Sequence, residues 1–314
     1  MDRREFLRQL GMIGLGAMAS CLGHAAEGGT MSKLARRRYG GTGLELSIIG
    51  LGGIAVSQVP QAEANDTVAW AVDRGVNYFD VAPTYSDAQD RLGPALKPYR
   101  ATSFLACKSV KRDAAGMREE LENSLRVLQT DYFDLYQLHG VSNMDEVEQV
   151  FAPGGAMETM VEAREEGKAR WLGFSAHSEE AAIELLNRFK FDSVLFPFNA
   201  VCMEHSGFGR ELINAAKRRE AALLGLKAIA WTPWAEGVER RYSKTWYEPA
   251  DDPETADLLL RYALDLPLTA TVPPGEASLF KLAVELASRY EPLDAGGRAD
   301  LLTKVKNVKP IFPH

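Results

Sequence analysis

The feature that most constrains the fold is a regular alternation of short apolar runs with amphipathic segments. Several of the runs are almost continuously hydrophobic, which is typical of parallel strands buried on both faces. The segments between them repeat apolar residues at helical spacing. We expect strands at residues 46–53, 77–82, 103–109, 133–140, 169–176, 191–200, 226–233 and 268–275. We expect helices at residues 61–75, 113–129, 144–169 (interrupted at 153–155), 178–190, 210–220, 252–265 and 278–290.

Eight strand–helix units in one continuous alternation predict a (β/α)8 TIM barrel of the α/β class. An open doubly wound sheet is the alternative, because the same alternation also builds that fold. The chain has 314 residues, and no sequence repeat, low-complexity tract or linker divides it. We therefore expect one barrel domain over residues 31–314, preceded by a separate segment at residues 1–30.

Composition excludes several classes of function. The formal net charge is −7 and no basic patch spans a domain, which argues against nucleic acid as the main partner. The three cysteines are Cys21, Cys107 and Cys202, with no CxxC pair and no His/Cys cluster at metal-ligand spacing. This pattern argues against a disulfide framework, a structural zinc or an iron–sulfur cluster, so we expect no metal site.

Residues 1–30 differ from the rest of the chain. "MDRREFLRQL" carries the pair Arg3 and Arg4, and a weakly apolar run follows that is too short to span a bilayer. The segment resembles a twin-arginine (Tat) export signal, which implies the Tat machinery as a partner and a periplasmic location. Two alternatives remain: a lipid anchor on Cys21 in "MASC", and a cytoplasmic protein that starts at Met31.

Four ionisable residues follow three neighbouring predicted strands. Asp80 ends the second strand and Tyr85 lies five residues beyond it, while Lys108 ends the third strand and His139 the fourth. A lone lysine in such a place is usually solvated, and a lone histidine is usually a packed neighbour. However, catalytic groups of TIM barrels gather at the carboxyl ends of the strands. We therefore expect these four side chains to meet in one site.

Their chemistry suits the reduction of a carbonyl group. A phenol with a pKa near 10 is a poor acid at neutral pH, so Tyr85 needs a neighbouring cation to stabilise its phenolate. Lys108 supplies that cation and Asp80 orients it. His139 polarises the carbonyl oxygen and Tyr85 protonates it. Since no side chain donates hydride, a nicotinamide cofactor is implied.

The chain resembles the aldo-keto reductase family. The matching stretches include "GGTGLELSIIGLGG", "YFDVAPTYSDAQDRLGPAL", "LACKS", "TDYFDLYQLHG" and "EEGKARWLGFSAHS", and they lie between about residues 36 and 275. The resemblance implies a (β/α)8 barrel that reduces aldehydes and ketones with NAD(P)H. It also implies that Asp80, Tyr85, Lys108 and His139 are the catalytic tetrad.

The resemblance carries over to cofactor contacts less evenly. It implies that Ser175 bonds the nicotinamide carboxamide and that Trp231 stacks on the ring, whereas Ala176 and Leu195 replace polar residues common in the family. After the eighth strand, Glu276 stands where the 2′-phosphate of NADP would need a donor. NADP(H) is the expected cofactor and NAD(H) the alternative. The expected cofactor-binding residues are Gly53, Asp80, Ser175, Trp231, Gly275, Ser278 and Lys281.

Substrate contacts are expected from His139 and from Trp234. Trp234 opens an aromatic loop at residues 234–252, and the C-terminal residues 305–314 are a second candidate segment. Aromatic loops suit apolar or sugar-like carbonyl compounds.

Two other functions compete with a barrel reductase. "GLGGIA" at residues 50–55 fits a dinucleotide-binding turn, but Pro60 intervenes before any helix, which favours a barrel loop in which Gly53 approaches the cofactor. A cofactor-binding sensor with little turnover is the second alternative.

Overall fold

The computed structural model of the chain describes residues 33–312. The export signal predicted at residues 1–30, the alternative anchor Cys21 and the alternative start at Met31 lie outside the described residues. Within residues 33–312, no helix is both long enough and apolar enough to cross a bilayer.

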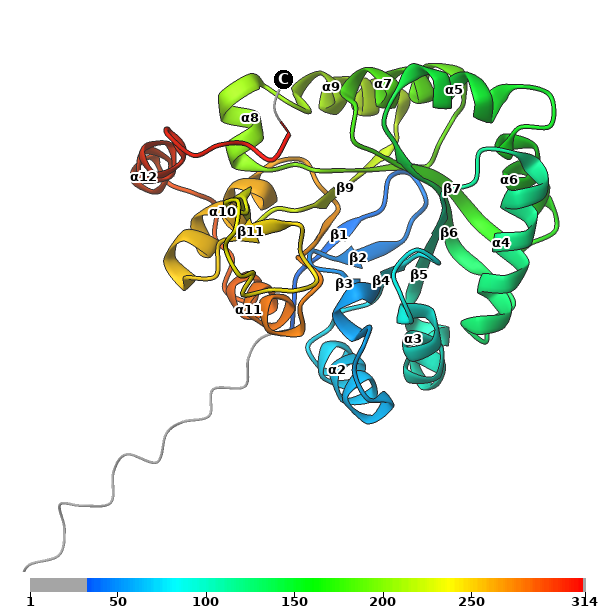
Figure 1. The fold of residues 1–314 in the computed structure, drawn as a ribbon, viewed down its shortest axis with the longest axis horizontal. Helices are drawn as coiled ribbons and strands as arrows, with labels where there is room; N and C mark the ends of the chain where they lie inside the picture. Colours follow the sequence, from blue (N-terminus) through cyan, green and yellow to red (C-terminus); the bar gives the residue numbers. More distant parts are fainter. Residues whose placement is uncertain (1–32, 313–314) are drawn as a thin grey trace, which may run out of the picture. The chain divides into compact units, whose positions relative to one another are not determined.

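Eight parallel strands form a barrel surrounded by helices (Figure 1). The last strand reaches the first through a parallel bridge between Ile49 and Thr271. Two backbone hydrogen bonds support that bridge, from Gly50 N to Thr271 O at 3.0 Å and from Thr271 N to Ile48 O at 2.9 Å. The predicted TIM barrel is therefore confirmed, and the open-sheet alternative is wrong. The strands are β3 (Leu51–Gly52), β4 (Tyr78–Val81), β5 (Phe104–Ser109), β6 (Phe133–Val141), β7 (Ala169–Ala176), β8 (Ser193–Phe196), β9 (Ala222–Leu226) and β12 (Ala270–Val272).

Helices cover the outside of the barrel in chain order (Figure 1). They are α2 (Gln61–Asp73), α3 (Ala88–Leu96), α4 (Ala114–Val127), α5 (Met144–Phe151), α6 (Ala156–Glu165), α7 (Glu179–Arg188), α8 (Ala200–Ser206), α9 (Arg210–Arg219), α10 (Pro253–Asp265), α11 (Ala277–Ala287) and α12 (Ala295–Val305). Two short 3-10 helices are also present: η1 (Gly53–Val56) lies between β3 and α2, and η2 (Lys97–Thr102) lies between α3 and β5.

Local capping signals set several helix ends. The Asp113 side chain accepts a hydrogen bond from Gly116 N at 2.8 Å, and Ser178 accepts one from Ala181 N at 3.2 Å, so both residues act as N-caps. The predicted break within residues 144–169 is confirmed. A Cβ on Gly155 would lie 2.5 Å from Val150 O, so this tight connection between α5 and α6 requires glycine.

Three helices were not predicted: α3, α8 and α12. α3 contains Gly93 and Pro94, which obscure a helical pattern. Gly93 is nevertheless needed, because a Cβ there would lie 2.7 Å from Val127 O at the end of α4. α12 lies beyond the eighth barrel unit.

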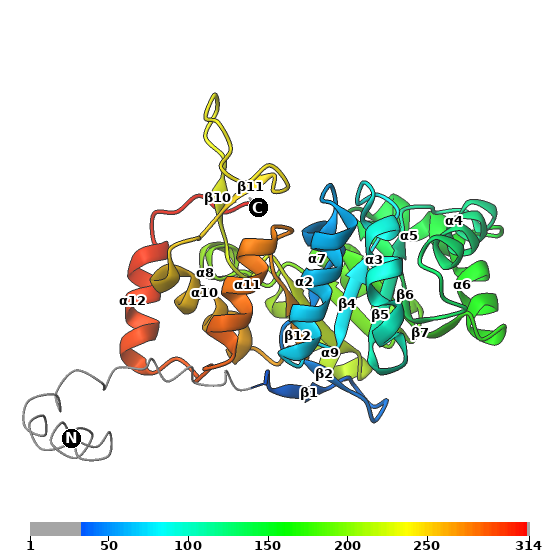
Figure 2. The ribbon, with the colours of Figure 1, turned by 90° about the horizontal axis from the view of Figure 1, so that it is seen from below.

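The first predicted strand divides into two parts. Residues of β2 (Glu45–Ser47) pair with β1 (Arg36–Arg38) in an antiparallel hairpin, and only β3 belongs to the barrel. Figure 2 shows the hairpin at the opposite end of the barrel from β10 (Ala230–Pro233) and β11 (Tyr247–Pro249). Tyr39, which follows β1, is buried and donates to Ser193 Oγ at 2.8 Å. The amino-terminal end of the barrel is thus covered.

The prediction of a barrel strand at residues 226–233 is wrong. The seventh barrel strand is β9, which ends at Leu226, and residues 230–233 form β10. β10 pairs with β11 in antiparallel orientation, outside the barrel. Lys227 has a left-handed backbone conformation, with φ of 62°, and Ala230 N donates to its carbonyl oxygen at 3.0 Å. This turn separates two strands that read as one apolar run in the sequence.

Candidate active site

A cavity of about 250 Å³ lies at the carboxyl ends of the barrel strands. All four residues of the predicted tetrad line it. The remaining wall comes from the ends of β3, β7, β8, β9 and β12, from the loops after β3, β7, β9 and β12, and from the segment around β11. The lining residues are Gly52, Ile54, Asp80, Tyr85, Lys108, His139, Ser175, His177, Leu195, Leu226, Lys227, Lys244, Thr245, Trp246, Tyr247, Val272, Pro273, Pro274 and Gly275.

Asp80 and Lys108 form a buried ion pair at the strand ends. Asp80 lies in β4 and Lys108 in the adjacent strand β5, where parallel pairing sets Asp80 opposite Ala106. The Lys108 ammonium donates to Asp80 Oδ1. The other carboxylate oxygen accepts from Tyr78 Oη at 3.3 Å and from Gln137 Nε2 at 3.4 Å. Burial by itself disfavours the ammonium, yet Asp80 and Tyr85 raise the pKa of Lys108 above its ordinary value.

Tyr85 reaches the cavity from a turn that follows β4. Tyr85 N donates to Ala82 O at 3.1 Å, and the next residue, Ser86, has a left-handed φ of 53°. The Lys108 ammonium lies 4.9 Å from the centroid of the phenol ring. Burial raises the pKa of Tyr85, although the Lys108 cation acts in the opposite direction. We expected Lys108 to lower the pKa of Tyr85, but the rise caused by burial is larger. The phenol therefore keeps its proton.

His139 lies beside the phenol. The two ring centroids are 5.5 Å apart in an edge-to-face arrangement. The backbone oxygen of His139 accepts a hydrogen bond from Arg112 at 2.7 Å, and its Nδ1 lies 3.5 Å from Thr84 Oγ1. Burial, followed by the Lys108 cation, lowers the pKa of His139 to about 2. The imidazole is therefore neutral and carries one N–H.

Of the predicted cofactor contacts, Ser175 and Gly275 line the cavity with Asp80. Ser175 Oγ accepts from Gly140 N at 2.8 Å, so its hydroxyl can donate its own hydrogen to a ligand. A Cβ on Gly275 would lie 2.4 Å from Ile54 Cγ2, so glycine is required where these loops approach. Gly53 lies in η1 against Val81, one residue from the lining residues Gly52 and Ile54.

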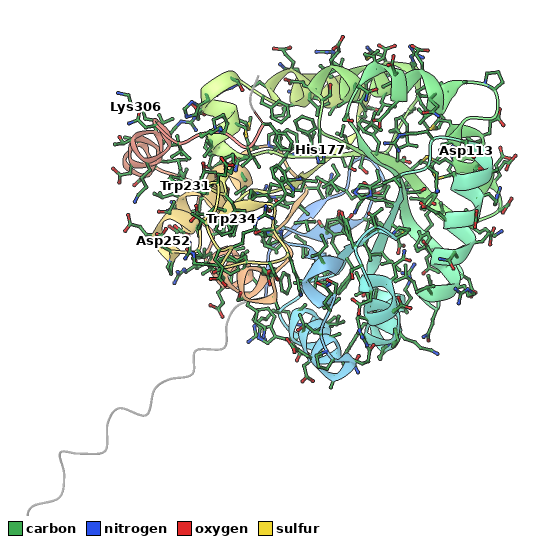
Figure 3. All side chains as sticks on the ribbon, in the orientation of Figure 1. Asp113, His177, Trp231, Trp234, Asp252 and Lys306 are labelled. Carbon is green, nitrogen blue, oxygen red and sulfur yellow. The ribbon has the colours of Figure 1, made fainter. Side chains whose placement is uncertain are left out.

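The other predicted contacts are not among the residues that line the cavity. Ser278 is exposed in the first turn of α11, and the Lys281 ammonium lies 5.7 Å from the centroid of the Trp70 ring. Trp231 belongs to β10, and Trp234 donates from its indole to Thr245 O at 3.1 Å. Figure 3 shows both tryptophans beside the barrel. Trp246 and Tyr247 supply the aromatic wall instead.

Sequence reasoning missed Lys227. It directly follows β9 and lines the cavity, with Nζ 3.3 Å from Nε2 of His177. The signal is the same as for Lys108, a lysine that ends an apolar run ("ALLGLK"). It was hidden because the strand was expected four residues later.

Comparison with known proteins decides the family. The family model described as "Aldo/keto reductase family" matches residues 48–291. The chain belongs to the aldo/keto reductase family. The matched range contains all four residues of the tetrad and every lining residue of the cavity.

Curated members of the aldo/keto reductase family and related oxidoreductases match part of the chain. Aldo-keto reductase YhdN of Bacillus subtilis is 32% identical over 190 residues, which cover 54% of each protein. L-galactose dehydrogenase of Arabidopsis thaliana is 27% identical over 162 residues, which cover 46% of this chain and 49% of that protein. The matches thus span about half the length of these relatives.

Solved aldo/keto reductases share the fold. The holo form of aldo-keto reductase AKR11C1 from Bacillus halodurans superposes with a TM-score of 0.67 at 24% identity, covering 87% of this chain and 96% of that one. The aldo-keto reductase from Klebsiella pneumoniae in complex with NADPH gives 0.65 at 20% identity, covering 90% and 96%. These likenesses establish the barrel architecture.

No cluster of three or more histidine, cysteine, aspartate or glutamate side chains within residues 33–312 of this family member could hold a metal ion. Cys107 and Cys202 are both buried thiols without a disulfide partner.

Proposed function

We propose that this aldo/keto reductase family member reduces an aldehyde or ketone, with a nicotinamide dinucleotide as the hydride donor and Tyr85 as the proton donor. The observation that carries the proposal is the convergence of Asp80, Tyr85, Lys108 and His139 on one cavity. When bound, the dinucleotide supplies the hydride that no side chain can provide.

The residues of the cavity fit a nicotinamide head group. Ser175 offers a hydroxyl donor to a carboxamide oxygen, and Leu195 supplies an apolar wall beside it. Gly275 keeps the loop after β12 close to Ile54 without a side chain in between. Trp246 and Tyr247 add aromatic surface on the side of β11. Such a mixture of apolar wall and a few directed donors is typical of a cofactor site.

Proton transfer is assigned to Tyr85. Its phenol remains protonated because burial raises its pKa, so it is ready to donate to a carbonyl oxygen that gains charge during reduction. The adjacent Lys108 ammonium reduces the cost of the phenolate that remains. Asp80 fixes the ammonium at that position, and it is itself held by Tyr78 and Gln137.

Polarisation of the carbonyl is assigned to His139. Because its pKa is lowered to about 2, the imidazole is a neutral donor at neutral pH. A neutral N–H can bond the carbonyl oxygen without competing with Tyr85 as an acid.

We propose NADP(H) as the cofactor, with NAD(H) as the alternative. Support for NADP(H) comes from the solved relative that holds NADPH. The structure also explains Glu276, whose carboxylate accepts from Lys244 N at 2.9 Å and so fixes the loop that includes Trp246. Ser278 and Lys281, at the start of α11, remain the proposed donors for a 2′-phosphate.

The experiment that tests this function is a titration of the purified full-length protein with NADPH and with NADH, followed by a screen of aldehydes and ketones for oxidation of the bound nucleotide. The proposal expects saturable binding and turnover. Binding without turnover of any carbonyl compound would favour the sensor alternative, and binding of neither nucleotide would reject both functions.

Export is proposed separately, on the twin-arginine pattern at residues 1–30. Fractionation of cells that express a C-terminally tagged chain tests it. Periplasmic protein of reduced mass supports a cleaved Tat signal, membrane-bound protein supports an anchor on Cys21, and uncleaved cytoplasmic protein rejects export.

A further inference from the structure

The cavity carries more positive than negative charge. Its wall contains three lysines, Lys108, Lys227 and Lys244, but Asp80 is the single carboxylate among the lining residues. Asp80 is already paired with Lys108. Among the described residues, no carboxylate lies within ion-pair distance of Lys227 or Lys244. A ligand with a negative group would therefore balance a charge that the protein leaves unmatched.

The ammonium of Lys244 holds two loops together, whereas the ammonium of Lys227 makes no such contact. Lys244 Nζ donates to Ser57 O at 2.7 Å, which ties the loop after β10 to the residue that follows η1. Within residues 33–312, Lys227 Nζ has only Nε2 of His177 at hydrogen-bond distance, 3.3 Å away. The Lys227 side chain is half-buried, and the cavity is the open space that it lines.

The backbones of both residues are held in place. Asn199 Nδ2 donates to Lys227 O at 3.1 Å, and Ala230 N donates to the same oxygen at 3.0 Å. His177 N donates to Val141 O at 2.9 Å, and its ring lies 5.3 Å from that of Phe312. Figure 3 shows His177 toward the middle of the barrel. The pair is thus preorganised at the edge of the cavity, where little entropy is lost on binding.

Burial, and then a neighbouring cation, disfavours a charged ammonium on Lys227. Burial and then the Lys108 cation lower the pKa of Lys227 to about 7. Burial and then the Lys227 cation lower the pKa of His177 to about 3. Other groups that face Lys227 are the thiol of Cys202 and the rings of Trp246 and Phe312, at 5.9 and 5.7 Å from its ammonium. An anion at this point would restore the charge of the lysine.

We infer that Lys227 and His177 form a carboxylate-binding subsite, which selects carbonyl substrates that also bear a carboxylate. The inference rests on the proposed reductase function, since it names the substrate class of that same cavity. Charge-assisted hydrogen bonds from the ammonium and from an imidazole N–H would hold the carboxylate. The carbonyl group would extend toward Tyr85 and His139.

The same chemistry could come from a phosphate of the dinucleotide, but the position of Lys227 favours substrate. Lys227 lines the same cavity as His139, the residue assigned to the reacting oxygen. Lys244, in contrast, is tied to Ser57 and to Glu276, at the start of α11. The Lys227 subsite therefore lies in the cavity that contains the proposed catalytic residues Tyr85 and His139.

The test compares an acid with its neutral isostere by calorimetric titration of the full-length protein, both alone and saturated with NADP⁺. The probes are 4-hydroxybutanoate and 4-hydroxybutanamide. Wild-type protein is expected to bind the acid at least about tenfold more tightly, the effect of one charged hydrogen bond. Lys227→Met should remove that preference. Lys227→Gln, which keeps a polar side chain, should do the same and serves as the second variant if methionine impairs folding.

Lys244→Met is the matched control, because it removes one lysine charge from the same cavity but leaves the Lys227–His177 pair. It should preserve the preference for the acid. The affinity of the Lys227 variants for NADPH should stay within about threefold of wild type. A wild-type protein with no preference for the acid would overturn the inference. A Lys227→Met protein that keeps the preference for the acid would also overturn it. A Lys227→Met protein that loses NADPH affinity instead would overturn it too, and would assign the subsite to a cofactor phosphate. Because the readout is binding, an absence of turnover would count against the reductase function alone.

Discussion

The ammonium of Lys108 and the carboxylate of Asp80 meet at the carboxyl end of two adjacent parallel strands, with side-chain exposures of only 1% and 4%. Neither charge has access to bulk water, so each depends on the other. Tyr85 stands over the ammonium, and its phenol therefore responds to a cation whose position the barrel fixes.

Asp80→Asn is expected to destabilise the fold by about 3–5 kcal/mol, because it leaves a buried ammonium without a counter-charge. Urea unfolding of the variant measures the loss. The double variant Asp80→Asn/Lys108→Met should be more stable than Asp80→Asn alone, since it removes the orphaned charge. An unchanged free energy of unfolding in Asp80→Asn would show that the pair contributes nothing to stability.

Tyr85→Phe is expected to lower kcat for carbonyl reduction by about 10²–10⁴-fold, which is the usual contribution of a general acid. NADPH affinity should be unchanged, because the ring and its packing remain. Steady-state kinetics and a cofactor titration check both parts. Tyr242→Phe, which removes a half-buried phenol that bonds Asp251 and does not line the cavity, is the control. Wild-type turnover in Tyr85→Phe would remove Tyr85 as the acid.

Stability should fall as the pH drops below about 6.5, because the unfolded chain binds protons at His139 and His177 that the folded chain does not. Their folded pKa values are lowered to about 2 and about 3, so the loss continues down to about pH 3 for both. Each histidine contributes at most about 1.4 kcal/mol per pH unit over that range. Unfolding at pH 4.5, 5.5 and 6.5 tests this. His177→Gln should show the shallower slope, and an identical slope would contradict the prediction.

Gly275→Ala is expected to weaken NADPH binding and to lower the free energy of unfolding by about 1–3 kcal/mol, because the added Cβ would meet Ile54. Thermal unfolding and cofactor titration measure the two effects. Gly41→Ala is the matched control, since nothing lies within 4 Å of a Cβ at that position. Equal stability and equal NADPH affinity of the two variants would mean that the loop after β12 can shift to accommodate the added Cβ without a measurable loss of free energy.

Quenching of tryptophan fluorescence by NADPH should come mainly from Trp246, which lines the cavity, rather than from Trp231 in β10. Trp246→Ala is therefore expected to lose most of the quenching, while Trp231→Ala should keep it. The reverse result would restore the stacking role that the resemblance to the family implied for Trp231.

The sequence by itself determined the barrel and four residues that meet in the cavity. Each of Asp80, Lys108 and His139 ends an apolar run, and Tyr85 follows one through a short turn. In a parallel barrel all such ends meet at one face, so local patterns were enough to predict a common site.

Only the tertiary structure decided the rest of the cavity wall. Whether residues 222–226 or 230–233 form the seventh barrel strand depends on partners far along the chain. β9 pairs with β8 and β12, while β10 pairs with β11. That choice brings Lys227 and Trp246 into the cavity and leaves Trp231 outside it. An apolar run encodes a strand but not its neighbour, because pairing is a non-local contact.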